Sequence, residues 1–139
     1  MEHEERIKHE ILESGASLPE EHNITTRIDH FNASSTDTFP MRYLVDKTYY
    51  NSSQGPLLFF TGGESGFSGI NKGGGVWGFY NNTGFVVETL AKRFGAIVVF
   101  AEHRYYGASM PFGDQSFNVT AGNLRFLTIE QVMQDFIAL

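Results

Sequence analysis

Residues 96–107, AIVVFAEHRYYG, decide the fold of this chain. The stretch opens with small, β-branched and aromatic apolar residues without polar alternation, a pattern typical of a strand buried on both faces of a parallel sheet. Charged and aromatic residues follow this strand directly, as they do at the ligand-binding edges of α/β sheets. We therefore predict a substrate-binding edge that consists of Glu102, His103, Arg104 and Tyr105.

A structural alternative stays open for the same residues. Glu102 and Arg104 carry opposite charges, and they are expected to form ion pairs at the end of the strand. His103 stands between them in sequence, so the alternative is that it belongs to a structural network rather than to a catalytic one.

A short strand and a helix precede this stretch and predict a βαβ unit. Residues 57–61, LLFFT, are expected to form a short buried strand, and residues 85–94 a helix that Gly95 ends. The order strand, helix, strand predicts two parallel strands joined by a right-handed crossover. A glycine-rich loop over residues 62–84 separates the first strand from the helix, and a loop of this length is usually functional. The apolar face expected for the helix comprises Val86, Val87, Leu90, Ala91 and Phe94.

Two earlier strands, over residues 24–31 and 38–50, are predicted to form an antiparallel entry hairpin. The second alternates, with Phe39, Met41, Tyr43 and Val45 against Arg42, Leu44 and Asp46, and is therefore expected to be half-exposed.

The last residues, 127–139, predict a helix that begins with a capping box between Thr128 and Gln131. No stop signal closes it, and two parallel strands do not make a complete sheet, so we expect the N-terminal part of a larger α/β domain. The face of this helix that we expect to be buried comprises Ile129, Val132, Met133, Phe136 and Ile137.

The composition, with 41% hydrophobic and 19% charged residues in a chain of 139, fits one small domain. A net charge of −6 argues against a nucleic-acid partner. Residues 1–22 hold seven acidic and two basic residues, so we predict a mobile or marginally helical acidic leader there and a folded body over 23–139. The N-terminus lacks the pattern of a signal peptide, and no apolar run is long enough to span a bilayer.

Cofactor and metal sites are not indicated. The chain has no cysteine, and its five histidines do not cluster at metal-ligand spacing. The glycines at 73, 75 and 78 match a dinucleotide-binding motif in spacing but lack the strand before it and the helix after it. N-glycosylation sequons begin at Asn23, Asn32, Asn51, Asn81 and Asn118.

The loop that follows residues 57–61 carries a second candidate site. Ser65 is disfavoured as a nucleophile because the elbow motif G-x-S-x-G needs a small residue where this chain has Phe67. Gly63 and Glu64 directly follow a buried strand, so their backbone N–H groups are candidates for one side of an oxyanion hole. A plain flexible loop is the alternative.

The stretch FAEHRYYGASMPFGDQSF resembles the lysosomal Pro-X carboxypeptidase and dipeptidyl peptidase II family of serine exopeptidases. The resemblance implies an α/β-hydrolase fold with a helical cap domain inserted later in the chain, and a Ser-Asp-His triad that cleaves peptides beside proline in lysosomal or secreted settings. It covers about residues 24–139. Further segments that match in the same order are RIDHF at 27–31, TFPMRYLV at 38–45, LLFFTGGESG at 57–66, NNTGF at 81–85 and LRFLTIEQVMQDF at 124–136.

The same resemblance supports Gly63 and Glu64 as oxyanion-side donors and places the family's triad beyond residue 139. The isolated chain is therefore expected to be inactive, with no catalytic residue of its own. Expected partners are peptides with proline near a terminus, and self-association of a full-length form stays open. One alternative is a non-catalytic binding or decoy protein of this family. Another is an independent hydrolase that uses Ser65 and His103.

Overall fold

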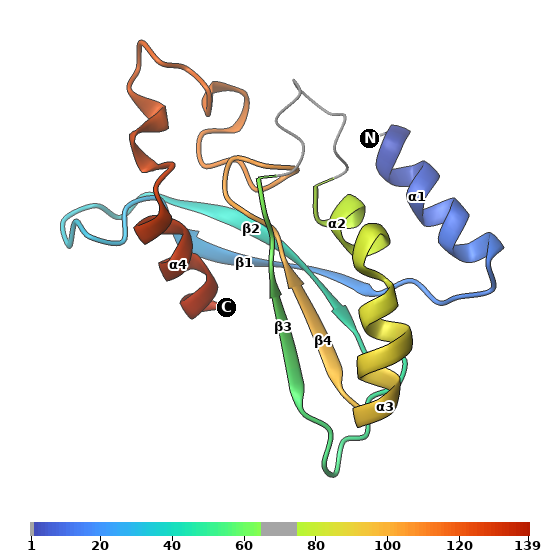
Figure 1. Ribbon diagram of the computed structural model, residues 1–139. Helices are drawn as coiled ribbons and strands as arrows, with labels where there is room; N and C mark the ends of the chain where they lie inside the picture. Colours follow the sequence, from blue (N-terminus) through green and yellow to red (C-terminus); the bar gives the residue numbers. More distant parts are fainter. Residues whose placement is uncertain (1, 65–74) are drawn as a thin grey trace.

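The computed structural model describes residues 2–64 and 75–139 as a mixed sheet with helices on both faces (Figure 1). The strand order of the sheet is β1-β2-β4-β3. β1 pairs with β2 and β2 with β4 in antiparallel fashion, whereas β3 and β4 are parallel. The predicted hairpin and the predicted parallel βαβ unit are both confirmed, although β1 begins and ends four residues before the strand predicted over residues 24–31. The strands are β1 (Glu20–Arg27), β2 (Thr38–Asp46), β3 (Leu57–Thr61) and β4 (Ile97–Ala101).

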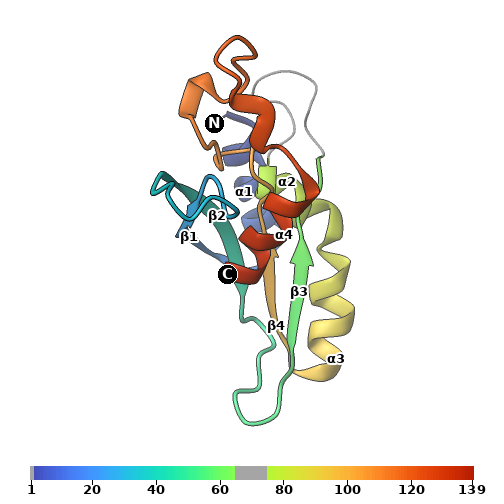
Figure 2. The ribbon, with the colours of Figure 1, turned by 90° about the vertical axis from the view of Figure 1, so that its left-hand side faces the viewer.

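The helical elements form two layers. Figure 2 shows α2 and α3 on one side of β3 and β4, with α4 on the other side. The prediction of a continuous loop over residues 62–84 is wrong for its last part, because α2 begins at Gly75. The elements are α1 (Glu2–Glu13), α2 (Gly75–Thr83), a π-helical turn (Val87–Ala91), α3 (Lys92–Phe94), 3₁₀ turns at Gly113–Gln115 and Asn123–Phe126, and α4 (Ile129–Ala138).

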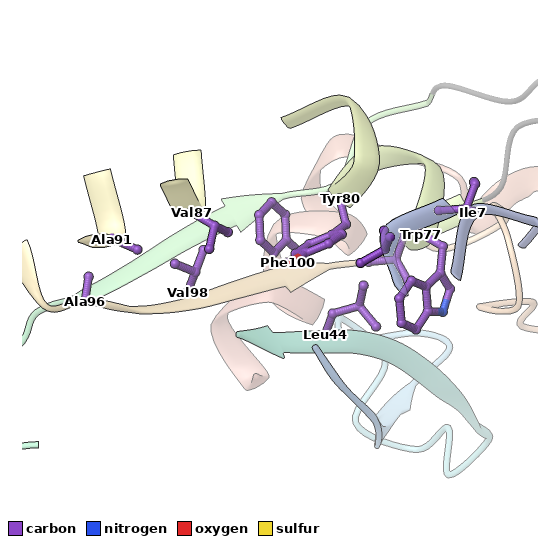
Figure 3. Close-up of a cluster of buried hydrophobic side chains, with 11 residues drawn as sticks. Ile7, Leu44, Trp77, Tyr80, Val87, Ala91, Ala96, Val98 and Phe100 are labelled. Carbon is purple, nitrogen blue, oxygen red and sulfur yellow. The ribbon is translucent and has the colours of Figure 1, made fainter. Parts of the chain in front are cut away.

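A hydrophobic cluster between the sheet and the α1–α2 layer forms the larger core. Figure 3 shows Ile7 of α1 and Trp77 and Tyr80 of α2 gathered around Leu44 and Phe100 of the sheet. Tyr80 and Phe100 pack edge to face, with their ring centroids 5.2 Å apart. A second cluster on the opposite face includes Ile28, Phe39, Met41, Tyr105, Tyr106 and Phe126.

β2 is buried on both faces, so the expectation of a half-exposed strand is wrong. Arg42, Leu44 and Asp46 alternate as predicted, but α1 and α2 cover the face on which they lie. Asp46 accepts a hydrogen bond from the Tyr80 hydroxyl at 2.8 Å, which provides a partner for its buried carboxylate. β3 was predicted to be buried, but it is an edge strand of the sheet and is only partly buried.

The helical segment between β3 and β4 contains a π-helical turn that changes which residues face the sheet. Val86, Val87 and Ala91 are buried as predicted, whereas Leu90 and Phe94 are exposed. The wider π turn inserts one residue into the helical repeat, so the α-helical periodicity assumed from sequence fails here. Gly95 ends the segment in the left-handed region at φ 61°, which confirms its predicted role.

α4 begins as predicted, since the side chain of Thr128 accepts a hydrogen bond from the Gln131 backbone N–H. Its buried face is different from the prediction: Val132 is buried and Phe136 packs on Phe59, but Ile129, Met133 and Ile137 are exposed. Gln131 and Asp135 are buried instead, because they bind polar groups of β1, the segment after it and the end of β4. These polar contacts, rather than the apolar stripe, orient the helix.

Arg104 makes the central contact of this polar set, and its guanidinium is fully enclosed. It donates to both carboxylate oxygens of Asp135, at 2.6 and 2.8 Å. It also donates to the backbone carbonyls of Arg27, Ile28 and Phe126. The predicted ion pairing of Arg104 at the end of the strand is confirmed, and it joins β1, β4 and α4.

The predicted leader contains α1, whose Ile7 and Ile11 are buried in the larger core. β1 begins at Glu20, so the predicted boundary after residue 22 falls inside a strand, and the division into leader and body remains a prediction. In the described residues, no helix has both the length and the apolar character needed to cross a membrane.

The corrected face of α4 predicts unequal effects on stability for two neighbouring residues. Val132→Ala should lower the free energy of unfolding by about 1–3 kcal/mol, because it removes buried methyl groups. Met133→Ala, on the exposed face, should change it by less than about 0.5 kcal/mol. Urea unfolding followed by circular dichroism measures both, and equal losses would contradict the orientation of α4.

Candidate active site

A small hollow lies at the carboxyl ends of β3 and β4. It brings the predicted oxyanion-side loop next to the predicted substrate edge, although Gly63 and Glu102 are 39 positions apart in the chain. Glu64, Arg104 and Tyr105 do not line it. The lining residues are Gly62, Gly63, Gly75, Val76, Phe79, Ala101, Glu102, His103 and Tyr106.

Gly62 holds the oxyanion-side loop against the end of β4. Its backbone N–H donates to the Ala101 carbonyl at 2.8 Å. A Cβ at this position would overlap that carbonyl and crowd the backbone nitrogen of His103, so the close approach requires glycine. Gly63 has no such constraint, because a Cβ there would meet open space. Within residues 2–64 and 75–139, the backbone N–H groups of Gly63 and Glu64 have no hydrogen-bond acceptor.

Glu102 is the most constrained residue at this edge. Its buried carboxylate accepts five hydrogen bonds, from Arg42 Nε and Nη2, the Val76 and Ala108 backbone N–H groups and the Ser109 hydroxyl. Val76 lies in the first turn of α2, where the helix dipole favours a negative charge. The predicted ion pairing of Glu102 is thus confirmed. The carboxylate fixes the start of α2 and the turn after β4 relative to β2.

Arg42 is the partner that sequence reasoning missed. Its alternation pattern suggested an outward side chain, yet only 6% of that side chain is exposed. Burial alone lowers the pKa of Arg42, but hydrogen bonds to Glu4 and Glu102 outweigh this effect and raise it above the ordinary value. The sequence did contain a signal for this pair. An arginine at position 42 stands among apolar residues of a strand, and a glutamate at position 102 follows another apolar strand.

His103 lies at the rim of the hollow and is largely buried. Its Nδ1 is 2.6 Å from the Arg104 carbonyl, which can only accept, so Nδ1 carries the proton. The ring packs edge to face on Tyr106. Burial first, and then the charge of Glu64, raise the pKa of Tyr106. His103 and Tyr106 therefore form an aromatic wall beside the glycine loop.

Arg104 and Tyr105 turn away from the hollow. Arg104 is consumed by the contacts with α4, and the Tyr105 hydroxyl donates to the Asn123 carbonyl at 2.5 Å. Tyr105 adopts a positive φ of 68°, which sends its side chain into the second core cluster. Of the four predicted substrate-edge residues, Glu102 and His103 reach the hollow and these two lie behind it.

A threonine, a histidine and an aspartate meet near α4 in an arrangement that superficially resembles a catalytic triad. His30 Nε2 lies 2.7 Å from Asp135 Oδ1 and 3.3 Å from Thr26 Oγ1. A triad needs the acid and the hydroxyl on different ring nitrogens, and here both use Nε2. Asp135 is also saturated by Arg104, so this cluster is structural. Ser65, the alternative nucleophile, lies outside the described residues.

The sequon asparagines lie at the surface, away from the hollow, and Asn118 is the least accessible of them. Its Nδ2 donates to the Gln115 side chain, while its Oδ1 accepts from the Ala121 backbone N–H. No group of metal-binding side chains occurs in the part of the chain that the structure describes. The exposed sequon residues are Asn23, Asn32, Asn51 and Asn81.

Comparison with known proteins identifies the family that this geometry comes from. Residues 26–139 match the model of the serine carboxypeptidase S28 family. The chain belongs to this family. The S28 match contains the hollow, Arg42 and Arg104, and it confirms the resemblance expected from the EHRYYG stretch. α1 lies outside it.

Individual relatives agree with the S28 assignment. The chain is 45% identical to the human lysosomal Pro-X carboxypeptidase over 113 residues, which are 81% of this chain and 21% of the relative. It is 39% identical to the putative serine protease pcp-1 of Caenorhabditis elegans, over 81% of this chain and 18% of that one. A probable extracellular serine carboxypeptidase of Arthroderma benhamiae is 36% identical, over 82% and 15%. The chain thus spans only 15–21% of the length of these relatives.

The two glycines of the loop give a matched test of the site geometry. Gly62→Ala should destabilise the protein by about 1–3 kcal/mol, because the added methyl group forces the loop away from β4. Gly63→Ala should stay within about 0.5 kcal/mol of wild type, since its methyl group enters open space. Thermal unfolding of both variants measures this difference. Equal effects would mean that the loop does not lie against β4.

Proposed function

We propose that this chain forms the oxyanion side of a serine exopeptidase of the S28 family. The observation that supports this most directly is the hollow shared by Gly62, Gly63, Glu102 and His103, because it places the loop after β3 beside the end of β4. In an α/β-hydrolase the loop after the third strand supplies an oxyanion-hole N–H. Gly63 and Glu64 are the proposed donors.

The division of labour among the remaining edge residues follows from their contacts. His103 and Tyr106 form a wall on which part of a substrate can rest. Glu102 and Arg104 do not act on substrate in this proposal, because their charged groups are fully engaged in structural contacts. Glu102 holds α2 and the turn after β4, which both line the hollow, and Arg104 holds α4 on the other side of the sheet. Tyr105 supports the same edge from behind.

The substrates are proposed to be peptides with proline near a terminus, by analogy with the relatives named as Pro-X carboxypeptidases. A lysosomal or secreted location is proposed on two grounds. Relatives are described as lysosomal or extracellular, and four of the five sequon asparagines are exposed. No cofactor is proposed, because peptide-bond cleavage by a serine nucleophile does not need one.

A binding or decoy role is the second candidate, and the edge of the sheet favours it. β3 is an edge strand with the uncharged sequence LLFFT. The exposed side chains of α4, Ile129, Met133 and Ile137, add an apolar stripe near it. Edge strands without charges readily pair with other chains. Such a protein would pair with a relative instead of cleaving peptides.

The proposed donors are tested in a chimera in which residues 26–139 replace the matching segment of the human lysosomal Pro-X carboxypeptidase. Replacing the correct donor by proline, in Gly63→Pro or Glu64→Pro, should lower kcat about 10²–10³-fold, because proline has no N–H. Gly63→Ala and Glu64→Ala keep the N–H and serve as controls. Normal kcat in both proline variants of a folded chimera would exclude the oxyanion role.

The isolated chain is predicted to be inactive, because an oxyanion hole without nucleophile and base cannot form an acyl-enzyme. The 139-residue chain should neither release a residue from a proline-containing peptide nor react with a fluorophosphonate probe. The intact chimera is the positive control. Turnover that Ser65→Ala abolishes would instead support the independent hydrolase.

A further inference from the structure

The guanidinium of Arg42 is held in place by parts of the fold that do not include α1. Its Nε and Nη2 donate to Glu102 at 3.3 and 2.8 Å. Glu102 is itself fixed by backbone N–H groups of Val76 and Ala108 and by the Ser109 hydroxyl. The contacts with Glu102 therefore orient the guanidinium without any contribution from α1.

The remaining N–H groups of Arg42 point at α1, and a carboxylate occupies them. Arg42 Nη1 donates to Glu4 Oε2 at 3.0 Å, and Nη2 donates to Glu4 Oε1 at 2.6 Å. This is the paired geometry with which arginine binds carboxylates most specifically. Glu21 lies farther away, with Oε2 3.9 Å from Nη1, and it accepts a hydrogen bond from the Trp77 indole.

α1 is attached to the rest of the protein by this ion pair and by an apolar contact with the larger core. Ile7 and Ile11 are its buried apolar residues, and Lys8 Nζ lies 4.8 Å from the centre of the Trp77 ring. The connection to β1 is exposed over residues 14–17 and turns at Gly15, whose φ is +82°. A helix of 12 residues is only marginally stable by itself. Glu4 thus provides the ion-pair part of the attachment of α1, and the burial of Ile7 and Ile11 provides the apolar part.

We propose that Arg42 is the centre of a carboxylate-binding site that Glu4 fills from within the same chain, and that a carboxylate from another molecule takes this site when α1 leaves. The ligand class is a carboxylate, whether it comes from a peptide C-terminus or from an acidic side chain. The family match includes Arg42 and Glu102, which form the site, but it does not include Glu4, which fills it. The proposal does not rest on peptidase activity.

The physical reason is the cost of an unsatisfied buried cation. Arg42 keeps Glu102 when α1 leaves, but the two N–H groups that bound Glu4 then lose their acceptor, and the carboxylate left nearest to them is that of Glu21, 3.9 Å from Nη1. Buried donors without partners are costly, and charged donors more so. Water can hydrate these groups in the opening, but a bidentate carboxylate satisfies both at once and also pairs with the positive charge, a geometry that chloride lacks.

The test uses the full chain with Glu4→Ala, which deletes the four heavy atoms that make up acetate. The Arg42 Nε–H signal in ¹H–¹⁵N NMR spectra should shift saturably with sodium acetate, in the millimolar range expected for so small a ligand. Sodium chloride at equal ionic strength should not reproduce the shift. Wild type and Glu10→Ala are controls, because Glu10 lies on the same helix but is exposed and pairs loosely with Arg6.

A second readout follows α1 itself. Cleavage within residues 14–17 by a trace of protease should be about tenfold faster in Glu4→Ala than in Glu10→Ala, because α1 detaches more often. A peptide with a free C-terminal carboxylate and no acidic side chain should shift the Arg42 signal, and its amidated form should not. An amidated peptide that contains one aspartate tests whether an acidic side chain, rather than a C-terminus, can supply the carboxylate.

Each outcome decides the proposal. Saturable binding of acetate to Glu4→Ala alone supports it, as does folding of that variant in acetate but not in chloride. Equal shifts in Glu4→Ala, Glu10→Ala and wild type overturn it. The absence of a shift in folded Glu4→Ala also overturns it. That result would be seen if the Glu21 carboxylate took the place of Glu4 on Arg42. A variant that stays unfolded in acetate also overturns it.

Discussion

The buried ion pair between Arg42 and Glu102 is the interaction on which the structure around the carboxyl ends of β3 and β4 depends. Through Glu102 it fixes the first turn of α2 and the turn after β4, and through Arg42 it holds α1. These three segments come from distant parts of the chain. A hydrophobic contact is non-directional and could not specify their mutual positions as narrowly. The pair therefore contributes to geometry more than to net stability, as expected for a buried salt bridge with satisfied partners.

A second buried pair, Arg104 with Asp135, has the corresponding role on the opposite face. It attaches α4 to the end of β4 and to the carbonyls that follow β1. Glu102 and Arg104 are two residues apart in sequence and point to opposite faces, so one short stretch after β4 organises both helical layers. His103, between them, remains at the rim of the hollow.

The strands could be predicted from sequence because their patterns are local. LLFFT and the apolar run before Glu102 have the composition of strands, and Gly95 marks a helix end through its own backbone freedom. The burial of Arg42 and the orientation of α4 could not be predicted in this way. Both depend on charged partners distant in the chain, Glu102 and Arg104, and an alternation pattern shows which residues share a face but not what covers it. The π-helical turn was hidden because its sequence also fits an α-helix.

The enclosure of the Glu102 carboxylate ties three positions of the sequence together. Gly75 and Gly107 both have positive φ, and a Cβ on either would overlap this carboxylate. A larger residue at 75 or 107 is thus compatible with the fold only if the side chain at 102 becomes shorter, and a shorter side chain no longer reaches Arg42. Across related sequences these positions should therefore vary jointly or not at all. Such a coupled set is a means of recognising, in a distant homologue, whether this edge of the sheet is built in the same way.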